Sequence, residues 1–307
     1  MYILHISGDT VQILEGSFSR KKITVNSLYS VPMPSDYLDI PDDKGYEKLE
    51  AVVSNGLREL GENYQNKKIR VVVDNINIPF REMIVPTLNH KKTVELLRNE
   101  IFGDEKLAAS NTLDYIEVEK KVDGNKQSRL FVTYMDNTIL ADLQRLCKNL
   151  MFKLVAIDIG QNCSAKLLRY TAEYLPPSYV FVEMRDSIVI ISLVLEGKFK
   201  YTMTKSVVSL QTLRFKSERT YFVNEMTNAL RTAVELFHKL YPEQEFNDVV
   251  VAGTTEKYDL IAKAVGEKIG MQVTSLTVPP NMDSIGQEEY NDFFCTIGGL
   301  IRGEALK

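Results

Sequence analysis

The chain has 307 residues, of which 44% are hydrophobic and 25% are charged, and its formal net charge is −4 at pH 7. This composition predicts a folded globular protein that is long enough for two hydrophobic cores. Lys and Arg are scattered among Asp and Glu, which excludes the dense basic face that binds a phosphate backbone. We therefore expect no nucleic-acid partner.

The sequence also contains no run of eighteen apolar residues, and its first residues do not form a basic segment followed by an apolar one and a cleavage site. We expect a cytoplasmic protein with no direct membrane insertion. The three cysteines lie far apart in apolar surroundings, which favours reduced thiols in the core. The three histidines are equally dispersed, so neither a zinc-binding spacing nor a Cys/His pair can be read along the chain.

In chain order, the sequence predicts three strands, a helix and a fourth strand, and the later half repeats this order. The strands are rich in Ile, Val and Leu, and the helices have apolar residues three or four positions apart. The expected strands are residues 2–6, 11–14, 22–31, 69–73 and 154–159, then 179–182, 188–195, 198–204, 248–252 and 273–276. The expected helices are residues 49–60, 163–172, 222–240 and 258–269.

Two β-β-β-α-β-α units that face each other across a cleft are typical of the actin/Hsp70-like fold. The sequence therefore predicts an α/β protein with two lobes and a duplicated βββαβα order. A small α+β subdomain, with expected strands at 80–85, 114–121 and 130–134, interrupts the first unit. We expect the first lobe to comprise residues 1–75 and 152–176, the inserted subdomain 76–151, and the second lobe 177–307.

Four segments carry a resemblance to a known family. They read FREMIVPTLNHKKTVELLRNEI at 80–101, RLFVTYMDNTILADLQRLCKNLMFKLVAIDIG at 129–160, VVVAGTTEKYDLIAKAVGEKIGMQV at 249–273 and FFCTIGGLIRG at 293–303. In order and spacing the chain resembles, nearly end to end, the PilM family of actin-like proteins in type IV pilus assembly, which is related to the division protein FtsA.

The resemblance implies where a nucleotide would bind. In actin-like ATPases the phosphates lie between two hairpin turns, where small residues admit backbone N–H groups and an Asp organises magnesium through water. The resemblance puts His5 at the first Asp of the family pattern and Ser7 at a glycine, and it leaves Gly8, Asp9 and Thr10 as the small polar turn. An ordinary hairpin turn explains these residues equally well.

The second turn and the adenosine turn depart from the family pattern as well. Glu183 and Asp186 retain carboxylates, but Arg185 stands in the place of a glycine, and a plain hairpin is the alternative interpretation. Gly253 is kept in the adenosine turn, whereas Thr254 replaces a further glycine and could simply cap a helix. If a cofactor binds, the resemblance implies ATP with magnesium.

The residues Asp158-Ile159-Gly160 match the phosphate-binding motif of the family, but they precede a helix instead of the second strand of a hairpin. We expect it to form a glycine-dependent turn at the lobe interface and not to touch a ligand.

The degenerate motifs favour a scaffold over an enzyme. By resemblance, the scaffold lies at the inner face of the cytoplasmic membrane and binds the amino-terminal tail of a PilN-like bitopic protein in the groove between the first lobe and the inserted subdomain. It would connect indirectly to the pilus motor ATPase. One alternative is a slow ATPase whose nucleotide state controls partner binding. Another is a filament-forming division protein, which the ending GLIRGEALK disfavours because it forms no amphipathic helix.

Overall fold

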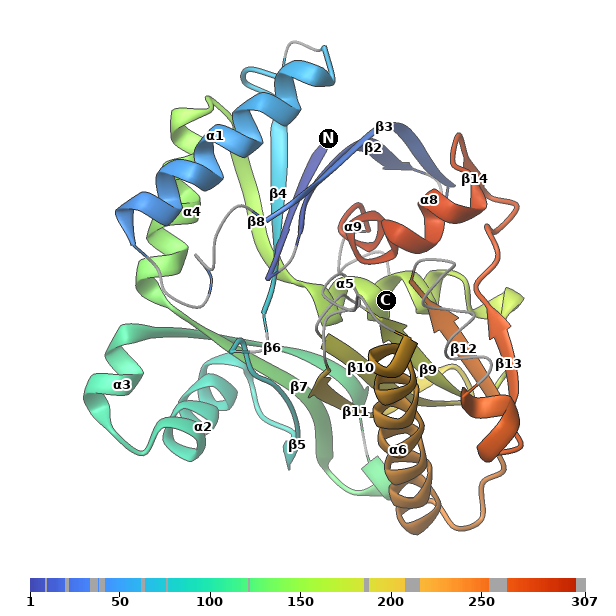
Figure 1. The fold of residues 1–307 in the computed structure, drawn as a ribbon. Coiled ribbons are helices and arrows are strands. Elements are labelled where there is room, and N and C mark those ends of the chain that lie inside the picture. The colour runs from blue at the N-terminus through green and yellow to red at the C-terminus, as the bar shows by residue number, and fades with distance from the viewer. Residues whose placement is uncertain are drawn as a thin grey trace.

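The structure is a computed structural model that describes residues 1–8, 10–19, 22–33, 38, 42–61, 64–75, 77–120, 122–184, 188–207, 216–253 and 264–301. Two large sheets and one small sheet form the frame of the molecule (Figure 1).

The first large sheet has the strand order β14-β3-β2-β1-β4-β8. Strands β1 to β3 form an antiparallel meander, and β4 and β8 add to it in parallel. The strands are β1 (Tyr2–Ser7), β2 (Thr10–Ser19), β3 (Lys22–Pro32), β4 (Lys68–Asp74), β8 (Lys153–Ile159) and β14 (Met282–Asp283).

The second large sheet has the strand order β11-β10-β9-β12-β13, again with an antiparallel meander followed by parallel strands. Its strands are β9 (Tyr179–Met184), β10 (Ile188–Leu195), β11 (Lys198–Ser206), β12 (Asp248–Ala252) and β13 (Gln272–Ser275). Without β14, the first sheet has the same order, third-second-first-fourth-fifth. The duplication predicted from the sequence is therefore confirmed.

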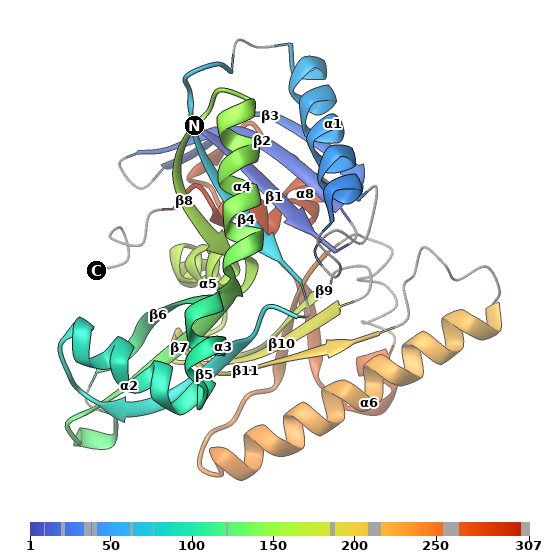
Figure 2. The same ribbon diagram turned by 90° about the vertical axis from the view of Figure 1, so that its left-hand side faces the viewer.

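Helices cover both faces of the first sheet and separate it from the second (Figures 1 and 2). Helices α1 (Asp43–Glu59) and α4 (Asn137–Asn149) pack on one face, and α5 (Gly160–Tyr170) and α9 (Phe294–Gly298) lie between the two sheets. Helix α6 (Lys216–Leu240) covers the outer face of the second sheet. The core between the lobes contains residues of both sheets, such as Ile3, Val72, Phe181 and Val250.

Two elements differ from their predicted bounds for physical reasons. Strand β2 continues beyond residue 14 to Ser19, because a β-bulge after Glu15 carries the strand through Gly16. A Cβ atom on Gly16 would lie 2.7 Å from the carbonyl oxygen of Thr24, so only glycine fits there. Helix α1 starts at Asp43, six residues early, because Asp42 caps it and its first turn carries no apolar repeat.

The inserted subdomain is a three-stranded antiparallel sheet in the order β5-β7-β6 with two helices on it. Its elements are β5 (Phe80–Pro86), α2 (His90–Phe102), α3 (Glu105–Ser110), β6 (Asn111–Lys120) and β7 (Gln127–Asp136). Glu119 of β6 accepts hydrogen bonds from Lys200 of β11 at 2.9 and 3.0 Å, so the subdomain also contacts the second lobe.

The last described segment returns to the first sheet. Strand β14 pairs with β3, and α8 (Gln287–Asp292) and α9 pack against β1 and β2. These contacts cross the boundary expected at residue 177, and the division of the chain into lobes stays a prediction. The expected helix at 258–269 lies partly outside the described residues, and 264–268 are helical.

Candidate functional site

The first predicted phosphate turn is closed by its own hydroxyl groups. The Thr10 N–H donates to Oγ of Ser7 at 2.9 Å, and the hydroxyl oxygens of Ser7 and Thr10 lie 2.9 Å apart. Gly8 is exposed, with the Asn75 amide nitrogen 3.9 Å from the position of an added Cβ. Asp9 lies outside the described residues. The turn is therefore held together by a serine side chain, as an ordinary hydroxyl-capped hairpin turn is.

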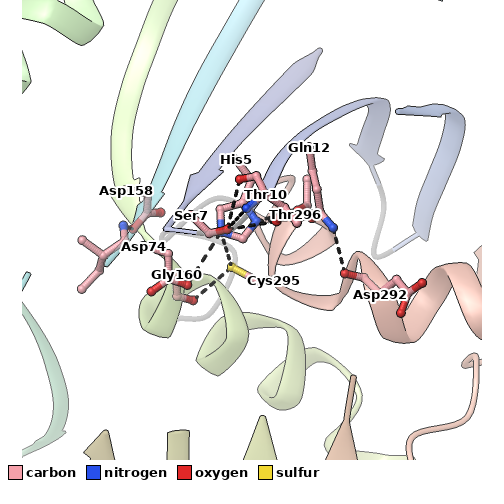
Figure 3. Close-up of polar contacts among 11 residues, drawn as sticks. His5, Ser7, Thr10, Gln12, Asp74, Asp158, Gly160, Asp292, Cys295 and Thr296 are labelled. Carbon is pink, nitrogen blue, oxygen red and sulfur yellow. Dashed lines mark hydrogen bonds and ion pairs between the residues drawn. The ribbon is translucent and has the colours of Figure 1, made fainter. Parts of the chain in front are cut away.

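Two residues before Ser7 on β1, His5 is buried in a polar cluster whose members are far apart in sequence (Figure 3). Its Nδ1 lies 3.0 Å from Oγ1 of Thr296 and 3.3 Å from Oε1 of Gln12. Its Nε2 lies 3.7 Å from Oδ2 of Asp74 and 3.8 Å from Sγ of Cys295.

The sequence analysis missed this cluster. A Cys/His pair could not be read along the chain because His5 and Cys295 are separated by 290 positions. The fold brings them together, since α9 packs on the end of β1. All three cysteines are buried and none forms a disulfide, as expected for core thiols. The signal available in the sequence was weak, namely polar residues such as His5 and Gln12 in otherwise apolar strands.

Glu183, the carboxylate expected at the second turn, points into the core. It is 4% exposed, near the end of β9, and lines a cavity of about 10 Å³ together with Ser164 and Gln161 of α5. Burial raises the pKa of Glu183 to about 8, against a smaller opposing effect of the neighbouring Ser164 hydroxyl. The carboxyl group is therefore mostly protonated at neutral pH. Arg185 and Asp186 lie outside the described residues.

Gly253 ends strand β12 beside the end of β9, where its backbone needs glycine. Its φ is +135°, and an added Cβ would lie 3.1 Å from the carbonyl oxygen of Met184. The predicted adenosine turn and the second phosphate turn thus begin next to each other. Thr254 lies outside the described residues.

The Asp158-Ile159-Gly160 motif is engaged within the protein. Lys166 Nζ donates to Oδ2 of Asp158 at 2.6 Å, and Asn162 Nδ2 donates to its Oδ1 at 2.7 Å. Burial alone would raise the pKa of Asp158, but Lys166 and the hydrogen bonds lower it below its ordinary value. The expected glycine-dependent turn is wrong: Gly160 has no positive φ and is the first residue of α5. The side chains of Asn162 and Lys166, in the first two turns of this helix, fold back onto Asp158.

The residues at the expected phosphate turns do not suit a magnesium nucleotide. Water-bridged magnesium needs a charged carboxylate, whereas one expected position carries a histidine and the other a carboxyl group that is protonated at neutral pH. Within the described part of the cleft, His5 and Glu183 thus fit such a complex poorly.

The two sheets of equal strand order, with helices α5 and α9 packed between them, define the class of the protein. It has the fold of the actin-like ATPases. No family model matches the sequence, and no curated protein sequence matches it.

Solved structures with this fold cover nearly the whole chain. The chain is similar to a structure of the PilM-PilN type IV pilus biogenesis complex, with a TM-score of 0.76, 16% identity, and coverage of 97% of this chain and 96% of that chain. It is also similar to a Bacteroides thetaiotaomicron protein with an actin-like ATPase fold and unknown function, with a TM-score of 0.53, 12% identity and 90% of each chain covered. A third is the ethanolamine utilization protein EutJ from Carboxydothermus hydrogenoformans, with a TM-score of 0.51, 10% identity, and 98% and 89% covered.

A helix that is long and apolar enough to cross a membrane does not occur among the described residues.

Proposed function

We propose that this chain is a cytoplasmic PilM-like scaffold of type IV pilus assembly that binds the amino-terminal tail of a PilN-like membrane protein. The observation that carries the proposal is the similarity to the PilM-PilN complex, which extends over 97% of this chain at a TM-score of 0.76. Coverage so complete cannot leave out the inserted subdomain, which contains the resembling segment 80–101 and most of the segment 129–160.

The cleft supports holding a partner over hydrolysis. Glu183 is buried and mostly protonated, and His5 replaces the first carboxylate of an actin-like site. An enzyme that depends on magnesium-bound phosphate requires charged groups at these positions. The pilus motor ATPase would then be reached through the membrane partner.

The proposed peptide site is the junction of the first lobe and the inserted subdomain. Helix α4 connects these two parts, and its side chains Ile139, Leu143 and Leu146 are buried in the core of the first lobe. On the inserted subdomain, Ile84, Leu88 and Leu107 are 48%, 41% and 47% exposed. An extended tail with apolar residues would cover such side chains while its own backbone stays straight.

A titration by calorimetry tests the proposal. A synthetic peptide copied from the amino terminus of the neighbouring PilN-like protein should bind with micromolar affinity, and a scrambled peptide should not. Hydrogen exchange should then slow in both the first lobe and the inserted subdomain. No binding at high micromolar peptide, or protection confined to the second lobe, would contradict the proposal.

Two leucines provide a matched pair of variants. Leu88→Asp, on the inserted subdomain, should weaken peptide binding about tenfold, because a charge replaces an apolar contact. Leu240→Asp, on a leucine that is 49% exposed at the end of α6, should leave the affinity unchanged. Equal affinities for the two variants would show that the peptide does not contact Leu88.

A calorimetric titration with ATP distinguishes the scaffold from the slow ATPase. ATP is expected to bind weakly, with no difference between samples with and without magnesium. Micromolar, magnesium-dependent ATP binding together with turnover would instead favour a slow ATPase whose nucleotide state controls partner binding.

A further inference from the structure

We infer that His5, Asp74 and Cys295 form a binding site for a zinc-type transition-metal ion. The three side chains come from β1, from the end of β4 and from α9, and each is at most 5% exposed. One ligand atom of each lies within 4.8 Å of the others. This inference does not depend on the proposed scaffold function.

The distances suit a small tetrahedral ion. Nε2 of His5 is 3.7 Å from Oδ2 of Asp74 and 3.8 Å from Sγ of Cys295. Neighbouring ligand atoms around tetrahedral zinc lie about 3.3–3.6 Å apart, given its bond lengths of about 2.0–2.3 Å. Asp74 and Cys295 therefore need to approach Nε2 of His5 by only a few tenths of an ångström, and the distance between their own ligand atoms, which is within 4.8 Å, has to shorten to the same range.

The hydrogen bonds around the imidazole fix its orientation for such binding. Nε2 of Gln12 donates to the backbone oxygen of Asp292 at 3.1 Å, so the amide oxygen of Gln12 faces the cluster (Figure 3). The Thr296 hydroxyl donates to that oxygen and can therefore only accept from His5.

Nδ1 of His5 must then carry a proton, and Nε2 is the nitrogen directed at Asp74 and Cys295. This is the arrangement of zinc-binding histidines, whose second nitrogen donates to a polar group that holds the ring in place.

The ligand types and their charges select the metal. A thiolate and an imidazole favour zinc-type ions, whereas Mg²⁺ and Ca²⁺ prefer oxygen ligands. Without metal, the Cys295 thiol donates to the carbonyl oxygen of Gly160 at 3.5 Å. When Zn²⁺ binds, the S–H bond breaks, its proton leaves to solvent, and a Zn–S bond forms. One Zn²⁺, one thiolate and one carboxylate sum to zero, which lowers the cost of burial.

Such an ion would join three parts of the chain that are distant in sequence. It would hold α9 against β1 and β4, two residues before the turn that Ser7 and Thr10 close. With three protein ligands, a water molecule completes the tetrahedron.

Cobalt(II) is the first probe, because its spectrum reports both thiolate ligation and four-coordinate geometry. The full chain, stripped of metal with a chelator, should take up one Co²⁺ and develop a thiolate-to-cobalt charge-transfer band, and Zn²⁺ should displace it. Cys295→Ala should abolish the band, whereas Cys147→Ala, which also removes a buried thiol, should retain it. Asp74→Asn and His5→Gln should weaken binding at least tenfold.

The absence of a band in the wild-type chain, or a band that survives Cys295→Ala, would overturn the inference. Zinc should also raise the melting temperature of the wild-type chain by about 4 °C at a hundredfold excess over Kd.

A measurement without variants covers the case in which Cys295→Ala does not fold. The wild-type chain is alkylated under native conditions with and without equimolar Zn²⁺, and each cysteine is followed by mass spectrometry. Zinc should slow alkylation of Cys295 at least tenfold and leave Cys147 unchanged. Equal rates at Cys295 with and without zinc would also overturn the inference.

Discussion

Asp158 and Glu183 are two carboxyl groups that contact helix α5 from different lobes and carry different charges. Asp158 ends β8 and faces Lys166 and Asn162, which lie four positions apart and therefore on one side of the helix. Glu183 lies near the end of β9 and faces Ser164, on another side of α5. A cation lowers the pKa of Asp158, whereas burial raises the pKa of Glu183. The side of the neighbouring helix therefore decides whether an acid at a strand end stays charged.

The largest effect is expected when Asp158 loses the cation that balances its charge. Lys166→Met leaves the Asp158 carboxylate in a mostly buried place without its cation and should lower the free energy of unfolding by about 4 kcal/mol. Chemical denaturation measures this loss. The matched control is Lys22→Met, whose salt bridge with Asp283 is about half exposed and should contribute less than about 1 kcal/mol.

The pH dependence gives a further check on Lys166. Because its folded pKa is lowered, Asp158 contributes stability at neutral pH that the wild-type chain loses as the pH falls through the acidic range. Lys166→Met should lose less stability on acidification than the wild type. Equal acid sensitivity would mean that the pair does not control Asp158.

The second effect concerns the uncompensated acid. The pKa of Glu183 is raised from 4.5 to about 8, so between these values the folded chain binds more protons than the unfolded chain, and stability falls as the pH rises. From pH 5 to pH 8 this loss amounts to about 3 kcal/mol. Glu183→Gln, which cannot ionise, should remove that slope. Denaturation curves at several pH values measure it, and an unchanged slope in the variant would show that Glu183 is charged in the fold.

A somewhat smaller effect is expected from disturbing the contact between α9 and α5, the helix that both Asp158 and Glu183 face. A Cβ on Gly298 would overlap the carbonyl group of Cys163, so Gly298→Ala should force the two helices apart and cost about 2 kcal/mol. Gly266→Ala is the control, since nothing lies within 4 Å of its Cβ position, and it should be neutral or slightly stabilising. Melting temperatures compare the two, and a neutral Gly298→Ala would show that the contact adjusts.

The smallest effect is expected at a carboxylate that has two cations. Glu119 accepts from both Lys200 and Arg129, so Lys200→Met leaves it one partner and should cost only about 1 kcal/mol. Lys120→Met, at a lysine whose side chain is 73% exposed, should cost nothing measurable. If Lys200→Met instead costs as much as Lys166→Met, the contact between the inserted subdomain and the second lobe is a main support of the fold.

The strands and helices were largely predictable because their signals are local. Apolar runs such as 69–73 and 188–195 became β4 and β10, and the repeat of apolar residues over 222–240 became α6. Boundaries failed where the deciding contact was not local, as at Gly16, whose need for glycine comes from the neighbouring strand. The prediction of a turn at Asp158-Ile159-Gly160 was wrong for a related reason. The structure of this motif depends on which side chains of the next helix contact Asp158.

By itself, the amino-acid sequence determined the order of elements, and with it the duplicated actin-like fold and the inserted subdomain. These follow from periodicity and from turn residues, which act over a few positions. Only the tertiary structure decided which side chains meet: His5 with Asp74 and Cys295, Asp158 with Lys166, and Glu183 with the interior beside Ser164. Partners up to 290 positions apart leave no pattern along a single chain, because packing of α5 and α9 between the sheets creates their proximity.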